Sequence, residues 1–168
     1  KLLDARKKTF AEDTLTHIGE LVRIISSRNN CKIIFSNFIE INDNVFGNFA
    51  NKLDFSFIYN LRKINFGLMD MSRELKYLFI NDINLLQSSF GFDRSFDPKL
   101  YITADMVFSL DFIPAVAKST VDIILSLSGK AKKCLILDLD NTLWGGIIGD
   151  DGVENIQIGE LGIGKAYT

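Results

Sequence analysis

Helix-like and strand-like segments alternate along most of this chain, and that alternation is the strongest constraint on its fold. Apolar residues at helical spacing predict helices over residues 9–28 and 55–75. A short apolar run of the kind that forms a strand follows each helix, over residues 31–38 and 77–80. Strands that are joined by helices pair in parallel, so this order predicts an α/β domain with a parallel sheet between helical layers, three layers in all.

Turn and cap residues set the limits of the remaining segments. Asparagine and aspartate are frequent in residues 40–54, which predicts a loop, and Pro98 lies in a second predicted loop over 91–99. Fourteen phenylalanines all precede residue 113, and we expect them to fill the core of this domain. Further helices are predicted over residues 83–86, 104–112 and 114–128, with Gly129 as the stop.

Length and charge limit what the chain can be. Its 168 residues suffice for one domain and part of another, so we expect a first domain over residues 1–129 and the beginning of a second over 130–168. The sequence starts without methionine and stops soon after a glycine-rich stretch, and we expect both ends to be cuts through a longer protein. A net charge of −2 argues against a nucleic-acid partner. No apolar run approaches the ~20 residues that span a membrane, and no signal peptide is visible.

The two cysteines indicate the redox state of the compartment in which the protein folds. Cys31 and Cys134 each open an apolar run, and their spacing matches no metal-binding pattern. We expect two buried, reduced thiols in a cytoplasmic protein.

A pair of aspartates follows the last strand-like run. The apolar residues from Cys134 predict a buried strand that gives way to Asp138 and Asp140, which are one residue apart. The carboxyl end of a parallel strand is where open α/β sheets bind ligands. Two carboxylates ~4 Å apart repel by about 4 kcal/mol at an effective dielectric near 20, so a shared proton or a Mg²⁺ is expected between them.

These residue types suit phosphoryl transfer. With a cation bound, Asp138 can stay ionised and attack phosphorus, and Asp140 can serve as general acid and later as general base. Asn141 favours a tight turn, and the Thr142 hydroxyl could fix the loop or bond a carboxylate, so both are candidate substrate-binding residues. The alternative of a loop that merely caps a helix stays open. A calcium loop is excluded, because its sixth and twelfth positions would hold Leu143 and Gly149.

The residues from Asp138 to Leu143 resemble the first motif of the haloacid dehalogenase (HAD) superfamily, and the longer string over 133–152 resembles its FkbH-like branch. The resemblance implies that Asp138 is the nucleophile and a Mg²⁺ ligand. It implies that Asp140 is the acid/base and binds the metal through its main-chain carbonyl. It also implies a preceding domain related to the Ser-Gly-Asn-His (SGNH) esterase fold. Family members of known role transfer a glyceryl group from 1,3-bisphosphoglycerate to an acyl carrier protein and release phosphate.

Other parts of a HAD site are not found after the motif. The second-motif Ser or Thr, the phosphate-binding Lys and the later acidic pair cannot be placed, so we expect the 168-residue chain to be inactive by itself. The leading hypothesis is a Mg²⁺-dependent phosphoryl/acyl transferase that acts on a phosphorylated small molecule with an acyl carrier protein as partner. A generic HAD phosphatase and a non-catalytic partner-docking module remain as alternatives.

One smaller signal lies directly after the motif. Gly145–Gly146 and Asp150–Asp151–Gly152 flank two isoleucines, a pattern that favours a hairpin. Such a hairpin would form a flap over the site and help to exclude water.

Overall fold

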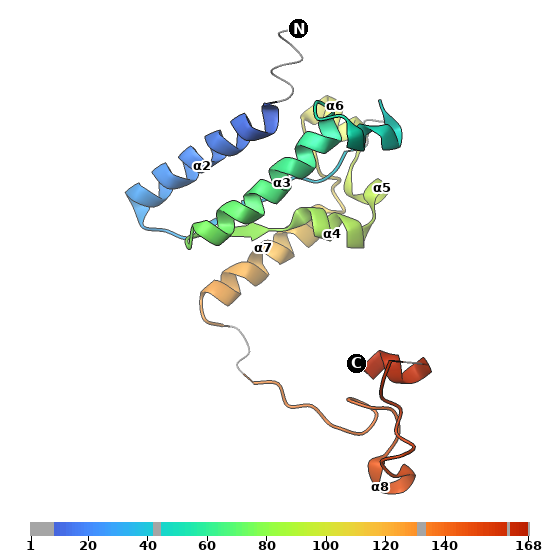
Figure 1. Ribbon diagram of the computed structural model, residues 1–168. Helices are drawn as coiled ribbons and strands as arrows, with labels where there is room; N and C mark the ends of the chain where they lie inside the picture. The colour runs from blue at the N-terminus through green and yellow to red at the C-terminus, as the bar shows by residue number, and fades with distance from the viewer. Residues whose placement is uncertain (1–8, 42–44, 131–133, 161, 168) are drawn as a thin grey trace. The chain divides into compact units, whose positions relative to one another are not determined.

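The computed structural model describes residues 9–41, 45–130, 134–160 and 162–167. The chain divides into two compact units, Lys1–Leu127 and Ser128–Thr168 (Figure 1). Each unit is described by itself below. Among the residues that the structure describes, no helix combines the length and the apolar character that crossing a membrane needs.

The first unit is built around a small parallel sheet. Helix α2 (Phe10–Asn29) leads to strand β1 (Ile33–Ser36), and α3 (Phe57–Glu74) leads to β2 (Leu78–Asn81). The two strands pair in parallel over all four residues of each. The predicted order of helix and strand is therefore confirmed, and the unit is a mixed α/β structure that is mostly helical. Strand β1 is shorter than predicted, and β2 has the predicted length but begins one residue later. The SGNH-like three-layer fold stays a prediction.

The segment after β2 differs most from the prediction. Residues 105–112 are not helical, because the helix in this region starts and ends earlier. Asp97 accepts hydrogen bonds from the amides of Lys99 and Leu100 at 2.8 and 3.2 Å, which caps a helix that begins at Pro98. Asp105 takes a left-handed conformation with φ +52° and ends it. The remaining elements of this unit are η1 (Gly47–Lys52), α4 (Ile83–Phe90), α5 (Phe92–Ser95), α6 (Pro98–Ala104) and α7 (Ile113–Leu127).

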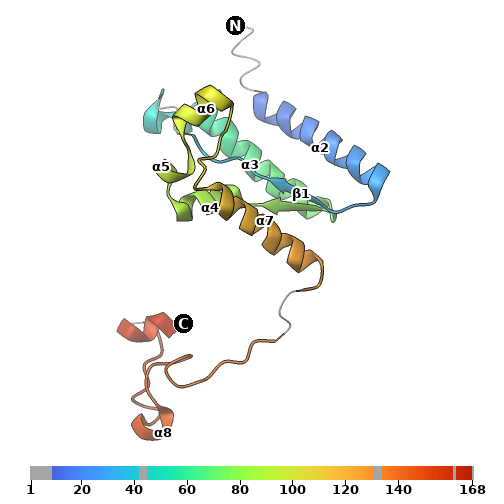
Figure 2. The ribbon, with the colours of Figure 1, turned by 180° about the vertical axis from the view of Figure 1, so that it is seen from behind.

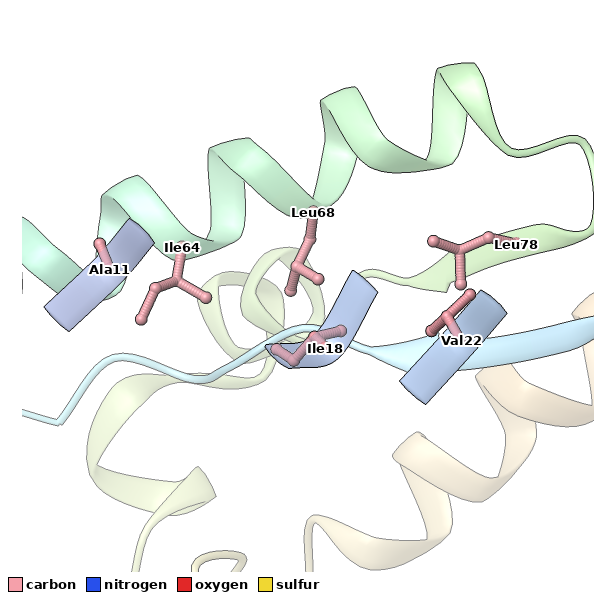
Figure 3. Close-up of a cluster of buried hydrophobic side chains, with 6 residues drawn as sticks. All are labelled: Ala11, Ile18, Val22, Ile64, Leu68 and Leu78. Atoms are coloured by element: carbon pink, nitrogen blue, oxygen red, sulfur yellow. The ribbon is translucent and has the colours of Figure 1, made fainter. Parts of the chain in front are cut away.

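Alternate strand residues face different helices. Leu78 and Ile80 point into the core that α2 and α3 form, where Leu68 of α3 is fully buried (Figure 3). Asn81 lies on the opposite face of the sheet, because side chains alternate along a strand. Its amide donates to the Thr120 hydroxyl of α7 at 3.0 Å, so helices contact both faces of β2 (Figure 2). The main core comprises Ala11, Ile18, Val22, Ile64, Leu68 and Leu78.

The expectation that phenylalanines fill this core is wrong for most of them. The core between α2, α3 and the sheet is aliphatic at its buried positions. Phe112 is the only buried phenylalanine among the described residues, in a second cluster with Ile39 and Ile83. Phe10 and Phe66 are 50% and 65% exposed. Their helices turn the aliphatic stripe inward and leave these rings on the outer side.

The second unit contains short elements. They are α8 (Ile148–Asp151), η2 (Gly162–Tyr167) and an antiparallel bridge between Gly145 and Gln157. The predicted strand from Cys134 is absent, since residues 134–137 form no ladder and Ile136 is 91% exposed. A buried strand needs neighbouring strands and covering helices, and the described residues of this unit supply neither.

The two cysteines also differ from expectation. Cys134 is exposed, because the strand that would have buried it does not form, and Cys31 is half-buried just before β1. Both are free thiols.

Candidate functional site

Asp140 is the most firmly held of the predicted site residues. One of its carboxylate oxygens, Oδ1, accepts a hydrogen bond from the indole Nε1 of Trp144 at 3.0 Å. The same oxygen accepts a second bond from the backbone amide of Ile148 at 3.2 Å. The side chain is half-buried. The loop that follows Asp140 therefore folds back onto its carboxylate.

Asn141 forms the turn that brings the loop back. Its backbone adopts φ +54°, a left-handed conformation that asparagine tolerates better than most residues. Its side-chain oxygen accepts from the Gly146 amide at 2.9 Å, and its own amide donates to the Gly146 carbonyl at 3.3 Å. The amide of Leu143 donates to the Leu139 carbonyl at 2.9 Å and tightens the turn further. The predicted turn at Asn141 is thus present, and its side-chain oxygen is already engaged with the backbone.

Asp138 and Thr142 lie on the exposed side of this loop. The Oδ1 atom of Asp138 accepts from the amide of the next residue, Leu139, at 2.8 Å. The two carboxylates therefore have different donors: the next backbone amide, that of Leu139, for Asp138, and the returning loop for Asp140. An exposed Asp138 beside a half-buried Asp140 is a suitable arrangement for one carboxylate that meets a substrate and one that stays aligned by the protein.

The predicted hairpin flap takes another form. Residues 148–151 make the single helical turn α8 in place of a two-residue turn at Asp151–Gly152. The Asp151 carboxylate accepts from the Ile147 amide at 2.8 Å, which stabilises the entry into this helical turn. The antiparallel contact appears further out, where Gly145 and Gln157 exchange backbone hydrogen bonds of 3.0 and 2.7 Å. A closed loop with a helical tip therefore takes the place of the predicted hairpin, and its role as a flap stays a prediction.

The oxygen atoms of the motif suit a hard cation. The described residues contain no cluster of three or more His, Cys, Asp or Glu side chains that could hold a metal by themselves. Mg²⁺ does not require such a cluster, because it commonly binds one or two carboxylates and fills its other positions with water and substrate phosphate. The exposed Asp138 carboxylate and the main-chain carbonyl of Asp140 are donors of the right kind. A Mg²⁺ site at these two positions stays a prediction from the motif.

Polar residues also gather where the two strands of the first unit end. Asn37 follows β1 and donates to the Asp82 carboxylate, directly after β2, at 2.7 Å. The Arg62 guanidinium makes two hydrogen bonds of 2.7 and 2.8 Å to the Glu40 carboxylate, and this contact raises the pKa of Arg62. The buried Gln87 bonds the backbone of Glu40 through both its amide nitrogen and its oxygen. These groups satisfy one another, which indicates that they hold the strand ends and the loop after β1 in place.

Comparison with known proteins identifies the family. The sequence model of the family described as FkbH, N-terminal domain, matches residues 1–125. The chain belongs to this family. The resemblance to FkbH-like proteins that the Asp138 motif indicated is therefore confirmed, and by a different part of the chain.

A solved structure resembles nearly the whole chain. It is the crystal structure of the N-terminal part of the protein BF1531 from Bacteroides fragilis, which contains a phosphatase domain and is complexed with Mg. The two sequences are 41% identical, and the TM-score is 0.83. The match covers 98% of this chain and 43% of that one, so the chain spans less than half the length of its solved relative. No curated protein matches the chain.

Sequence reasoning missed the two donors to Asp140. Trp144 belongs to the string that resembles the FkbH-like branch, and packing at the base of the predicted flap is the role that the sequence suggests for it. Its position four residues after Asp140 is the signal that could have indicated the hydrogen bond. The Ile148 amide carries no signal in the sequence, since any residue supplies a backbone N–H. The Trp144 donor could be suspected from the sequence, whereas the Ile148 donor is visible only in the structure.

Proposed function

We propose that this chain is part of a Mg²⁺-dependent phosphoryl/acyl transferase of the HAD superfamily, with its aspartate site at Asp138 and Asp140. The observation that carries the proposal is the closed loop, in which Asp140 is held by two donors while Asp138 stays exposed two residues earlier. The FkbH family membership supports it, and so does the 41% identity to a protein with a phosphatase domain and bound Mg.

The chemistry assigns one task to each aspartate. The Asp138 carboxylate attacks the phosphorus of a phosphate group on the substrate and forms an aspartyl phosphate, while the bond from phosphorus to the substrate's oxygen breaks. Asp140 supplies a proton where the leaving group needs one, and later removes a proton from the water that hydrolyses the aspartyl phosphate. Bound Mg²⁺ would neutralise the charge that two carboxylates and a phosphate bring together. Asn141 keeps the loop closed, and Thr142 offers an exposed hydroxyl to the substrate.

The substrate and partner follow from the family resemblance. We propose a phosphorylated small molecule of the glyceryl type, with an acyl carrier protein as the acceptor of the acyl group. The carrier thiol attacks the acyl carbon, the bond from that carbon to the phosphate oxygen breaks, and inorganic phosphate leaves with the thiol proton. Asp138 acts on a second phosphate group of the same substrate, because its attack on the acyl phosphate would only hydrolyse it. The free thiols of Cys31 and Cys134 are consistent with a reducing, cytoplasmic setting, which is part of the proposal.

The same proposal assigns the two parts of the chain. Residues 1–129 would form an SGNH-like α/β domain, and residues 130–168 would begin the HAD-like catalytic domain. The parallel pairing of β1 with β2, with helices on both faces, supports the first assignment. We also propose that the 168-residue chain has no turnover by itself, because its two aspartates provide only part of a HAD site.

A generic phosphatase is the second candidate. The description of the solved relative names a phosphatase domain and no carrier protein. Incubating the full-length protein with an acyl phosphate and a carrier protein separates the two functions. Acylated carrier supports the transferase, while phosphate release with unmodified carrier supports the phosphatase.

The test of the site is loss of the nucleophile. Asp138→Asn in the full-length protein should abolish labelling by ³²P-labelled substrate, because an amide cannot form the aspartyl phosphate. Asp150→Asn is a matched control, since Asp150 is an exposed carboxylate of the same loop and should label normally. Labelling of the Asp138 variant equal to that of the parent would exclude the assignment. A parent protein that never labels would favour the non-catalytic docking module.

A further inference from the structure

The two donors to Asp140 converge on a single oxygen. The indole N–H of Trp144 and the amide N–H of Ile148 both reach Oδ1, at 3.0 and 3.2 Å. An ionised carboxylate has two oxygens and about four acceptor positions, so donors are free to spread over both. Their convergence on Oδ1 fixes the rotation of the carboxylate about its terminal bond and gives Oδ1 and Oδ2 different roles.

The indole is itself held in place by the loop. Trp144 is half-buried and forms a backbone bridge with Asp140. The next residue, Gly145, is buried and exchanges two backbone hydrogen bonds with Gln157. A fixed indole four residues after the aspartate supplies a donor whose position does not depend on solvent.

We propose that Trp144 is a positioning residue for Asp140, which holds Oδ1 so that Oδ2 faces the reacting groups. This inference rests on the function proposed above and adds a residue that the HAD motif itself does not contain. Trp144 touches neither the phosphate nor the acyl group in this scheme. It acts through Asp140, and its loss should therefore slow the steps that need Asp140 and spare the attack by Asp138.

A change that removes only the donor tests this role. Trp144→Phe keeps an aromatic ring and deletes the indole N–H. Hydrogen bonds to charged groups contribute about 1.5–3 kcal/mol, so kcat should fall about 10- to 100-fold. KM for the acyl phosphate should stay within about twofold, because Trp144 does not bind the substrate. Aspartyl phosphate should still form and should accumulate, since its hydrolysis is the step that relies on Asp140 as base.

A second substitution restores a donor. Trp144→His places the imidazole Nε2 the same number of bonds from Cγ as the indole Nε1, so kcat should recover in part. Tyr167→Phe is the matched control, because it removes a polar group from an aromatic ring that lies against Gly145 in the same unit. Its kcat should equal that of the parent. Thermal unfolding of each full-length variant checks that the fold is kept.

The outcomes separate this inference from the proposed function. A Trp144→Phe variant with parental kcat overturns the positioning role, and the function stands if Asp138→Asn still fails to label. Equal losses in the Phe and His variants, with a matching fall in melting temperature, also overturn it, since Trp144 would then be needed only for folding. A parent protein without phosphoenzyme removes the proposed function and this inference with it.

Discussion

Replacing Gly67 by alanine should destabilise the first unit, although alanine is the better helix former. Gly67 lies inside α3, where a glycine costs about 1 kcal/mol relative to alanine. A Cβ at Gly67 would lie 2.4 Å from Cδ1 and 2.9 Å from Cδ2 of Leu15 on α2. The glycine is therefore what lets α2 and α3 approach each other.

The magnitude follows from two opposing effects. Alanine gains about 1 kcal/mol of helix propensity. Forcing an extra methyl against Leu15 costs about 1–3 kcal/mol, because the leucine must change its rotamer in a packed core or push the helices apart. The free energy of unfolding should fall by roughly 1 kcal/mol, the difference between these effects, as measured by equilibrium urea unfolding.

Gly19 on the facing helix provides the matched control. A Cβ there would lie 3.4 Å from both Arg23 and Met71, which is ordinary van der Waals contact. Gly19→Ala should therefore stabilise the unit by about 0.5–1 kcal/mol. A double-mutant cycle then tests the cause: in a Leu15→Ala background, Gly67→Ala should become stabilising. If Gly67→Ala stabilises the parent as much as Gly19→Ala does, the reasoning about helix approach is refuted.

Three further changes test other contacts. Ser119→Ala removes the hydroxyl that donates to the fully buried Asn81 at 2.6 Å, and unfolding by urea should show a loss of about 1–3 kcal/mol. The Lys63 ammonium that bonds Glu12 lowers the pKa of this carboxyl below its usual 4.5, so the pair stabilises the fold above that pH and the benefit is lost as the pH falls through the lowered pKa. Glu12→Gln should therefore lower stability at neutral pH, and the gap to the parent should close in acid. Gly146→Ala should increase proteolytic cleavage of the loop that follows Asp140, because Gly146 has φ +103° and a Cβ there would lie 3.0 Å from the carboxylate of Asp151.

Each of these predictions has a control variant or an outcome that would contradict it. Ser126→Ala removes another hydroxyl of α7, an exposed one, and should change stability by less than about 0.5 kcal/mol. Gly149→Ala lies in the same loop without a positive φ or a neighbour within 4 Å of its Cβ, and should leave cleavage unchanged. A gap between the Glu12→Gln variant and the parent that persists unchanged to strongly acid pH would contradict the ion-pair explanation.

The elements that sequence reasoning recovered are those whose pattern is local. The helices α2, α3 and α7 carry a continuous apolar stripe, and each lies within two residues of its predicted limits. The predicted helix over 104–112 is wrong, because the cap at Asp97 and the proline that follows it start the helix at Pro98. Capping residues fix where a helix begins. In this segment the cap places the helix earlier in the chain than the apolar periodicity predicts.

In the candidate site, too, some features could be predicted from the sequence and others could not. The turn at Asn141 was predictable because asparagine tolerates left-handed backbone, and the structure places it there. The strand before Asp138 was not, because an apolar run becomes a strand only where other strands and helices bury it. The contact between the Ile148 amide and Asp140 depends on how the loop closes, which is a property of its backbone path and not of its residue types.

The bare apolar run before Asp138 has a practical consequence for anyone who purifies this chain. Leu135 and Ile136 are 76% and 91% exposed, and a short, β-prone, uncharged segment of this kind readily associates with copies of itself. Charged residues stand on both sides of it in the sequence, with lysines before Cys134 and the two aspartates after Leu137. Neutralising those aspartates to probe the reaction would thus also remove a safeguard against aggregation, and the solubility of such variants should be measured alongside their activity.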